Sequence, residues 1–460
     1  MLKIFNTLTR EKEVFKPINS KQVGVYVCGV TVYDYCHLGH ARTYTSADVI
    51  IRYLRWRGYS INHVQNITDI EDKIIKRAKE NNESCDALTA RFIQAMHEDF
   101  AALNLSKPDH EPRATEFIPQ MIQLIEKIIA NGHAYVAGNG DVCFDVRSFK
   151  EYGCLSHHDI DDLESGARVD ISEAKRDPLD FVLWKLAKPG EPSWDSPWGK
   201  GRPGWHIECS AMSMQLLGTH FDIHSGGRDL IFPHHENEIA QSRAATHDKF
   251  ANTWIHGGFL QIDKEKMSKS LGNFVTIRDV LKDHSAEVVR YLLVASHYRS
   301  QLVYTEDALH QSQQALGRLY TALRALPEAK PTQNTLYEKQ FIEAMDDDFN
   351  TPIALSVLFE LAHEIQRCRE ANIAVAAGYG ALLRYLAGVL GILQSDPEQF
   401  FKSGSPVDAV KIEALIAGRQ QARKEKNWAE ADRIRDELAA MSVALEDGPT
   451  GVTWKIIKKQ

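Results

Sequence analysis

The stretch Val-Gly-Val-Tyr-Val-Cys-Gly at residues 23–29 decides how the first part of this chain folds. Its β-branched and aromatic residues, bounded by glycine, predict a buried strand. After a turn through 31–39, Ala47, Ile51 and Leu54 recur at i, i+4 and i+7, the spacing of one face of a helix. A second strand is expected at 61–67. This order predicts a βαβ unit of a parallel sheet, and such sheets bind ligands at the carboxyl ends of their strands.

The middle of the chain interrupts this βα rhythm. Five glycines between 132 and 166, and a run rich in proline and tryptophan at 189–203, predict an inserted domain that splits the sheet. Strand-like segments return at 221–224 and 254–262.

The last third of the chain changes character again. Alanine, leucine and glutamate dominate 305–395, which predicts a helical bundle, and 399–407 is typical of a linker. One or two helices should follow, with Ala431, Ile434 and Leu438 on one buried face. The segment 443–454 predicts two short strands around an Asp-Gly-Pro turn.

These observations predict an α/β fold: a Rossmann-like parallel-sheet catalytic domain split by an insertion, then a helical bundle and a small mixed α/β C-terminal domain. The expected segments are the first half of the catalytic domain at 1–118, the inserted connective domain at 119–203, the second half at 204–250, a lysine-bearing region at 251–304, the bundle at 305–398 and the C-terminal domain at 408–460.

The bulk composition, with 43% hydrophobic and 25% charged residues, is that of an ordinary globular protein. The N-terminus is too polar for a signal peptide, and we expect no membrane-spanning run of roughly 18 apolar residues. Seven cysteines, an odd number at irregular spacing, indicate a reducing cytoplasm. The net charge of −8 argues mildly against a nucleic-acid partner, but residues 401–460 carry 11 basic and 9 acidic residues.

Two short motifs, more than two hundred residues apart, point to nucleotide chemistry. His37 and His40 flank Gly39 at the start of the expected helix, where imidazoles can donate to triphosphate oxygens and glycine permits close approach. Lys266 and Lys269 lie in Lys-Met-Ser-Lys-Ser, where two ammonium groups on a loop can close over a pyrophosphate. The alternatives are two histidines that merely flank a helix and a solvated lysine-rich turn.

A third group of residues has the chemistry of a metal site. Cys28 ends the first strand, Cys209 follows Gly-Trp-His-Ile-Glu, and His234 and Glu238 are spaced i, i+4 as on one helix face. Two thiolates, an imidazole and a carboxylate suit zinc. Spacing alone leaves other ligands open, namely Cys36, Cys143, Cys154, His206 and His235.

Four runs of this sequence, at 25–40, 204–212, 232–238 and 266–273, closely resemble cysteinyl-tRNA synthetases, which are class I aminoacyl-tRNA synthetases. The likeness covers essentially the whole chain. It implies that Cys28, Cys209, His234 and Glu238 bind one zinc ion, which takes the thiolate of substrate cysteine as a further ligand. It also implies an anticodon-reading surface with Arg423, Trp428, Asp432 and Asp447, and contact of 251–304 with the tRNA stem; packing of Trp428 in a core is the alternative.

The resemblance implies that His37, Gly39, His40, Lys266 and Lys269 bind ATP with Mg²⁺. Candidates for the amino-acid pocket are Thr31, Thr68 and Trp205, and Asp229 is a candidate for the substrate amino group or the ribose of ATP. A core or capping role is the alternative for each. Asp346-Asp347-Asp348 could suggest magnesium, but a helix boundary is the favoured interpretation.

The predicted function is a cysteine–tRNA ligase, a cytoplasmic monomer that uses L-cysteine, ATP and tRNA(Cys). A zinc–thiolate bond can reject serine, whereas an ordinary pocket separates such near-isosteres by only about 1–3 kcal/mol. One alternative is a related ligase that transfers activated cysteine to an amino-sugar and lacks the anticodon-binding end. Another is a non-catalytic, zinc-stabilised RNA-binding protein. For the zinc itself, the alternative to a substrate-binding ion is a purely structural ion with four closed protein ligands.

Overall fold

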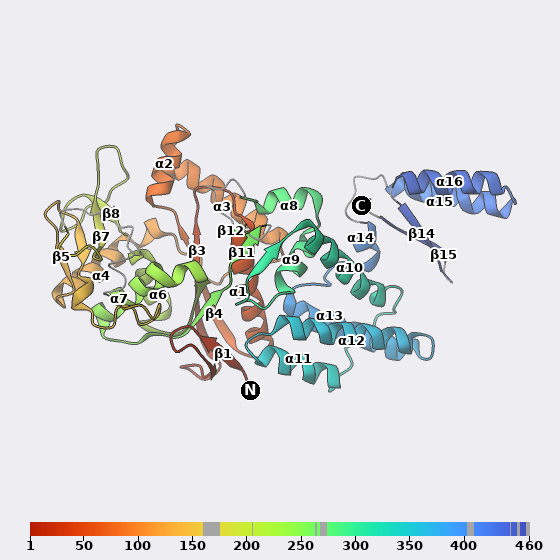
Figure 1. Cartoon of the computed structure of the whole chain (residues 1–460), viewed down its shortest axis with the longest axis horizontal. Helices are drawn as coiled ribbons and strands as arrows, with labels where there is room; N and C mark the ends of the chain where they lie inside the picture. Colours follow the sequence, from red (N-terminus) through yellow and green to blue (C-terminus); the bar gives the residue numbers. More distant parts are fainter. Residues whose placement is uncertain are drawn as a thin grey trace. The chain divides into compact units, whose positions relative to one another are not determined.

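A computed structural model describes residues 1–159, 175–204, 206–262, 265–266, 274–402, 409–441, 443–448 and 451–456. For 265–266, 409–411, 446–448, 451–453 and 455–456 it describes the backbone alone. The chain divides into two compact units (Figure 1). The first comprises Met1–Arg278, Leu293–Thr305 and Gln340–Ala354, and the second comprises Asp279–Leu292, Glu306–Lys339 and Leu355–Gln460.

A four-stranded parallel sheet is the centre of the first unit. Its order is β10 (Phe250–Gly257), β9 (His220–Gly227), β3 (Gln22–Thr31) and β4 (Ser60–Thr68). Helix α1 (Leu38–Trp56) joins β3 to β4, which confirms the predicted βαβ unit. Its Ala47, Ile51 and Leu54 are all buried, as their spacing predicts.

The region between β4 and β9 contains the inserted structure. An antiparallel sheet runs in the order β5 (Ala134–Val136), β6 (Val142–Phe144), β7 (Phe181–Leu186) and β8 (Gly201–Pro203). Helix α4 (Ile118–Ala130) precedes it. The helices α2 (Asp72–Glu80) and α3 (Cys85–Ala102) follow β4, and α6 (Ile207–Leu217) and α7 (Glu236–Thr246) flank β9 in sequence. Aromatic side chains fill the inserted part, where Phe144 stacks on Phe181 with ring centroids 5.0 Å apart.

The expectation of one strand over 254–262 is wrong, because the chain leaves the parallel sheet at Gly258. A side chain there would begin 2.3 Å from the Ser300 carbonyl oxygen, so the close approach needs glycine. The chain continues as β11 (Leu260–Ile262), which pairs with β13 (Leu302–Tyr304) and with β12 (Glu265–Lys266). A separate hairpin, β1 (Lys3–Asn6) and β2 (Glu11–Val14), begins the chain.

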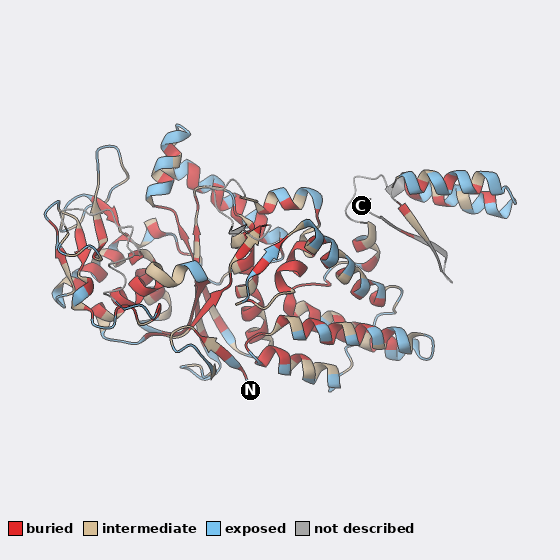
Figure 2. Cartoon of the chain, in the orientation of Figure 1, coloured by how far each residue is buried: buried red, intermediate tan, exposed pale blue. Residues whose placement is uncertain are grey.

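Helices dominate the later part of the chain, which confirms the predicted bundle (Figure 2). They are α8 (Ile277–Asp283), α9 (Ala286–Val294), α10 (Glu306–Leu323), α11 (Leu336–Asp346), α12 (Thr351–Arg369), α13 (Ile373–Leu390) and α14 (Pro397–Lys402). The expected linker at 399–407 is wrong in its first part, because α14 extends to Lys402 and buries Phe400 against Tyr320, with stacked rings 4.2 Å apart.

The C-terminal segment has the predicted form. Helices α15 (Ala409–Lys424) and α16 (Trp428–Ala440) are followed by the antiparallel strands β14 (Val443–Gly448) and β15 (Gly451–Ile456). Ala431, Ile434 and Leu438 are buried, as predicted, and a small core includes Trp454.

One helix qualifies as a membrane span by length and composition. Within the described residues this is α13, whose mean hydropathy is 1.6 and of which 56% is buried. The expectation that the sequence contains no apolar run long enough to span a membrane is therefore wrong for this helix. A core helix of a bundle has the same composition, and burial on this scale is typical of one.

The acidic triplet at 346–348 marks a helix boundary, as favoured from the sequence. Helix α11 ends at Asp346 and α12 begins at Thr351. Asp348 is fully buried and accepts hydrogen bonds from the Tyr298 hydroxyl at 2.7 Å and the Phe5 amide at 2.9 Å. Its other oxygen accepts one from the Arg299 guanidinium at 2.7 Å, so this carboxylate joins three segments of the first unit.

Candidate active site

The carboxyl end of β3 carries a distortion that positions Cys28. The β3–β4 register shifts between Val27 and Val30, which leaves Cys28 and Gly29 in an irregular stretch. A side chain at Gly29 would begin 1.5 Å from the Asn66 carbonyl oxygen, and the Gly29 amide donates to the Asn66 side chain at 2.8 Å. Only glycine permits this approach, and it determines where the Cys28 thiol lies.

His37 and His40 form the N-terminal cap of α1. The Nδ1 of His37 accepts from the His40 amide at 3.2 Å, and the Nδ1 of His40 accepts from the His37 amide at 3.3 Å. Their rings stack with centroids 3.7 Å apart. A neutral imidazole that accepts at Nδ1 carries its proton on Nε2, so each Nε2–H is a donor at the helix N-terminus, where anions bind.

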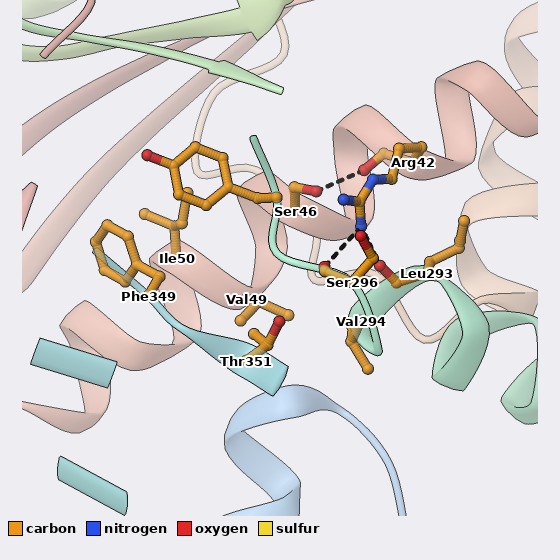
Figure 3. Close-up of a pocket in the computed structure, with 10 residues that line it drawn as sticks. Arg42, Ser46, Val49, Ile50, Leu293, Val294, Ser296, Phe349 and Thr351 are labelled. Carbon is orange, nitrogen blue, oxygen red and sulfur yellow. Dashed lines mark hydrogen bonds between the residues drawn. The ribbon is translucent and has the colours of Figure 1, made fainter. Parts of the chain in front are cut away.

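The helix that bears these histidines is anchored by Arg42. This side chain is buried and donates to the carbonyls of Leu293 and, at 3.2 Å, Ser296 (Figure 3). It also donates to the carbonyl of His297 at 2.6 Å. Burial without a carboxylate partner among the described residues lowers the pKa of Arg42 to about 10. The contact holds α1 against the segment that precedes β13.

The segment after the lysine motif pairs with the histidine motif. The Leu38 amide donates to the Val275 carbonyl at 3.1 Å, and the Ile277 amide donates to the Cys36 carbonyl at 2.9 Å. Phe274 packs edge-on against His37 with ring centroids 5.0 Å apart. Of the two lysines, Lys266 has a described backbone in β12, and Lys269 lies outside the described residues.

A buried cluster of metal-ligand atoms lies at the carboxyl end of β3. Its members are Cys28, His224, His235 and Glu238, whose candidate ligand atoms all lie within 4.8 Å of one another. Cys28 Sγ is 3.1 Å from His235 Nε2 and 3.6 Å from Glu238 Oε1, and Glu238 Oε2 is 2.7 Å from His224 Nε2. Behind the cluster, His235 Nδ1 is 2.8 Å from His256 Nε2.

The structure places the four predicted zinc ligands in two groups. Cys209 is buried at the start of α6 and forms a side-chain hydrogen bond with Cys28, near Glu238. His234 instead lies with its Nδ1 3.2 Å from His206 Nδ1, although it directly precedes His235 in the chain. Cys28, Cys209 and Glu238 therefore converge, and His235 rather than His234 is the adjacent imidazole.

The electrostatics of this cluster disfavour ionised thiols in the protein alone. The hydrogen bond with Cys209 raises the pKa of Cys28 well above its usual value, with burial and Glu238 adding to the effect. The same bond lowers the pKa of Cys209, but burial and Glu238 outweigh it and the pKa is raised. Burial also lowers the pKa of His235. A divalent cation would reverse the effect on the thiols, because it stabilises thiolate and carboxylate together.

Three of the remaining candidates for the amino-acid pocket lie in described parts of the chain. Thr31 and Thr68 face each other in the β3–β4 register, and Thr68 Oγ1 accepts a hydrogen bond from Asn66 at 3.2 Å. Asp229 is exposed just after β9, where its carboxylate lies over Gly227. Trp205 lies outside the described residues.

The anticodon candidates lie on α15, α16 and β14. Trp428 is 59% exposed, so it is not a core residue. Arg423 and Asp432 are also exposed, and Asp432 forms an ion pair with Arg435 at 3.2 Å. For Asp447 the structure describes the backbone in β14 and not the side chain.

Two histidines of the cluster region were missed by the sequence analysis. His224 lies in the middle of β9 and His256 in β10, and both are buried. The available signal was that each histidine falls in a segment expected to be a strand, since a buried imidazole needs a partner.

Three family models match the chain. The tRNA synthetases class I (C) catalytic domain matches residues 14–314, the DALR domain residues 340–394, and the cysteinyl-tRNA ligase anticodon binding domain residues 409–454. Cysteine–tRNA ligases of Vibrio atlanticus and Haemophilus influenzae are each 60% identical over 99% of this chain and 100% of their own length.

Among solved structures, the fold is similar to that of Mycobacterium tuberculosis methionyl-tRNA synthetase in complex with methionyl-adenylate. The TM-score is 0.58 at 16% identity, over 86% of this chain and 94% of that one. This likeness supports the class I fold, and the family models and the full-length identity are more specific. The chain belongs to the cysteinyl-tRNA ligase family of ATP-dependent class I aminoacyl-tRNA synthetases.

Proposed function

We propose that the chain is a cysteine–tRNA ligase that joins L-cysteine to tRNA(Cys) at the expense of ATP. The observation that carries this function is 60% identity to cysteine–tRNA ligases over the full length of both chains. The match to an anticodon binding domain at 409–454 leaves the amino-sugar ligase without support, because that alternative lacks this end. A catalytic-domain match over 14–314 likewise leaves a purely RNA-binding protein without support.

We propose that His37, His40, Lys266 and Lys269 bind the triphosphate of ATP, with Mg²⁺ and the backbone at Gly39. In the cap of α1 the Nδ1 of each histidine accepts a hydrogen bond, so each Nε2 carries the proton. Both Nε2–H groups are therefore donors at a helix N-terminus, where phosphate binds favourably. The pairing of Leu38 with Val275 supports a placement of the lysine motif beside the histidines, because Lys269 precedes Val275 by only six residues.

Adenylate formation needs little acid–base chemistry from the protein. The carboxylate of cysteine is already ionised and attacks the α-phosphorus, and pyrophosphate leaves. The terminal tRNA ribose, through its 2′-OH in class I enzymes, then displaces AMP from the adenylate. The contribution of these four residues is therefore positioning and stabilisation of phosphate charge.

We propose that Cys28, Cys209, His234 and Glu238 hold one zinc ion. The donors fit zinc, since two thiols and a carboxylate converge in a buried site that disfavours their charge. A zinc ion there supplies a ligand position for the thiolate of substrate cysteine, for which the hydroxyl of serine is a poor substitute. The cluster with His224 and His235 in place of Cys209 and His234 is the rival ligand set.

The remaining residues have supporting roles in this proposal. Thr31, Thr68 and Trp205 line the cysteine pocket, and Asp229 contacts the substrate amino group or the ribose. Trp428 stacks on an anticodon base, with Arg423, Asp432 and Asp447 beside it. We expect a cytoplasmic monomer, and sedimentation of the purified chain tests the monomer.

The first experiment is ATP–pyrophosphate exchange with cysteine, with serine as the control, followed by charging of total tRNA. Exchange with cysteine alone, together with charging, is the expected result. Exchange without charging would show that tRNA is not the acceptor. Equal exchange with serine would show that the substrate thiolate is not the basis of selection.

A second experiment separates the two zinc ligand sets. Zinc content is measured in His234→Ala, His235→Ala and His224→Ala, with His220→Ala, an exposed histidine at the start of β9, as the matched control. We expect His234→Ala to lose its zinc and the other three variants to retain theirs. Loss in His224→Ala and His235→Ala, with retention in His234→Ala, would assign the metal to the rival set.

A further inference from the structure

A cavity of about 250 Å³ lies in the first unit among α1, α3, β4 and the segment 105–111. At about 30 Å³ for each molecule of liquid water, it has room for about eight waters. It does not include His37, His40 or the cysteine–histidine cluster, so it is distinct from the candidate active site. About half of its lining residues are apolar or aromatic and the rest are polar or charged, so the cavity offers both packing surface and hydrogen-bonding groups.

The imidazole of His63 lines this cavity without a hydrogen-bond partner among the described residues. Its side chain is 4% exposed, and neither ring nitrogen has a hydrogen-bond partner among the described residues. Burial lowers the pKa of His63 to about 4, so the ring is neutral at pH 7. A neutral imidazole has one N–H donor and one acceptor nitrogen, so a ligand with an acceptor and a donor can form hydrogen bonds with both.

Gln65 lines the same cavity two residues further along β4. Residues i and i+2 of a strand share a face, so the carboxamide and the imidazole lie side by side. A carboxamide has a donor and an acceptor next to each other, and it can bind adenine at N6 and N7 through two hydrogen bonds.

Aromatic rings form another wall. Tyr44 and Phe100 both line the cavity, and their ring centroids are 4.9 Å apart with an interplanar angle of 46°. Such rings are the surfaces on which nucleobases stack. Charged groups lie toward the mouth, where His97 and Glu111 are paired at 2.7 Å and the exposed Lys107 follows.

We propose that this cavity is a second ligand site of the chain, which binds a purine base of the adenine type between Gln65, His63 and the ring of Tyr44. The base can come from a free purine compound or from an unpaired nucleotide of RNA. Tyr44 also contacts the candidate active site, because its hydroxyl donates to the Cys28 carbonyl at 2.9 Å.

The test is calorimetric titration of the full chain with adenine while the active site is occupied by a sulfamoyl analogue of cysteinyl-adenylate. Any remaining adenine binding then occurs elsewhere. We expect one saturable site, weakened at least tenfold in Gln65→Leu, which keeps the volume and removes the amide, and in His63→Phe, which removes both nitrogens. His220→Gln, which changes an exposed histidine at the start of β9 outside the cavity lining, is the matched control and should bind as the wild type does.

Labelling with ¹⁵N-histidine identifies the contact directly. The NMR signals of His63 are those absent from the spectrum of His63→Phe, and adding adenine to the wild type should shift them. Absence of saturable binding, or equal binding by wild type and both cavity variants, would overturn the proposal and leave ordered water as the occupant. Equal binding of uracil would overturn the purine assignment. Displacement of adenine by uncharged tRNA would identify RNA as the source of the base, whereas competition by adenosine alone would identify a free compound.

Discussion

Arg278 lies over the face of Tyr35, with its guanidinium carbon 5.1 Å from the ring centroid. The same guanidinium pairs with Glu98 at 2.6 Å and with Asp99 at 2.8 Å, both on α3. Arg278 therefore joins the start of α8 to the loop before α1. It holds the segment that follows the lysine motif against the segment that contains the histidine motif.

Replacing Arg278 should impair adenylate formation more than binding of cysteine. A displacement of about 1 Å in a reacting group can cost roughly a hundredfold in rate. We expect Arg278→Gln to slow ATP–pyrophosphate exchange at least tenfold, with partial recovery in Arg278→Lys and an unchanged affinity for cysteine by equilibrium dialysis. Lys282→Gln, which removes an exposed partner of Asp279 on the same helix, is the control. A normal exchange rate in Arg278→Gln would show that the contacts of Arg278 have no role in positioning the lysine and histidine motifs.

Lys269→Ala should slow adenylate formation and leave zinc in place. Loss of one donor to transition-state charge typically costs about 10²–10³ in rate. Single-turnover kinetics measure the step, and metal analysis of the same sample measures zinc. Loss of zinc would place Lys269 in the structural support of the metal and contradict its assignment to phosphate.

Cys209→Ser should lower both the zinc content and the affinity for cysteine, because it removes a thiolate ligand from the proposed set. Cys143→Ser, a buried cysteine of β6, is the matched control for loss of a thiol. The decisive quantity is the ratio of exchange rates with cysteine and serine. An unaltered ratio in Cys209→Ser would refute selection by the metal.

Asp348 should stabilise the first unit far more than its neighbour Asp347. Removing one partner of a buried ion pair costs roughly 3–5 kcal/mol, whereas an exposed pair contributes about 0–1 kcal/mol. Asp348→Ala leaves Arg299 without its carboxylate, and Asp347→Ala removes only an exposed partner of Lys12. Urea unfolding of both variants makes the comparison, and equal losses of stability would contradict it.

His63 should make the protein less stable as the pH falls from about 6.5 to about 4. Burial lowers its folded-state pKa to about 4, and Arg55 adds to this while Asp109 and Asp48 oppose it. The unfolded chain therefore binds a proton that the folded chain does not, which costs up to roughly 2 kcal/mol at pH 5 and nothing above pH 7. His63→Gln should lose correspondingly less stability between pH 7 and pH 5 in urea unfolding; an equal loss would show that His63 titrates normally.

The sequence predicted best what local periodicity determines. The β3–α1–β4 unit and the buried face of α16 follow from spacings of two to four residues, and the structure has both. The break at Gly258 escaped prediction because its cause, the Ser300 carbonyl, lies far along the chain. The neighbourhood of Cys28 was predicted only in part for the same reason, since the approach of His224 and His235 depends on how β9 and α7 pack.

The contact between Gly29 and Asn66 also limits how this enzyme can be redesigned. A library that aims at a larger amino-acid substrate would ordinarily vary every position beside the proposed zinc ligands. Position 29 should be withheld from such a library, because any side chain there collides with the Asn66 carbonyl oxygen and moves Cys28 with it. If Thr31 and Thr68 line the pocket as proposed, new space for a longer substrate can be made by shortening these two side chains, which are register partners on β3 and β4.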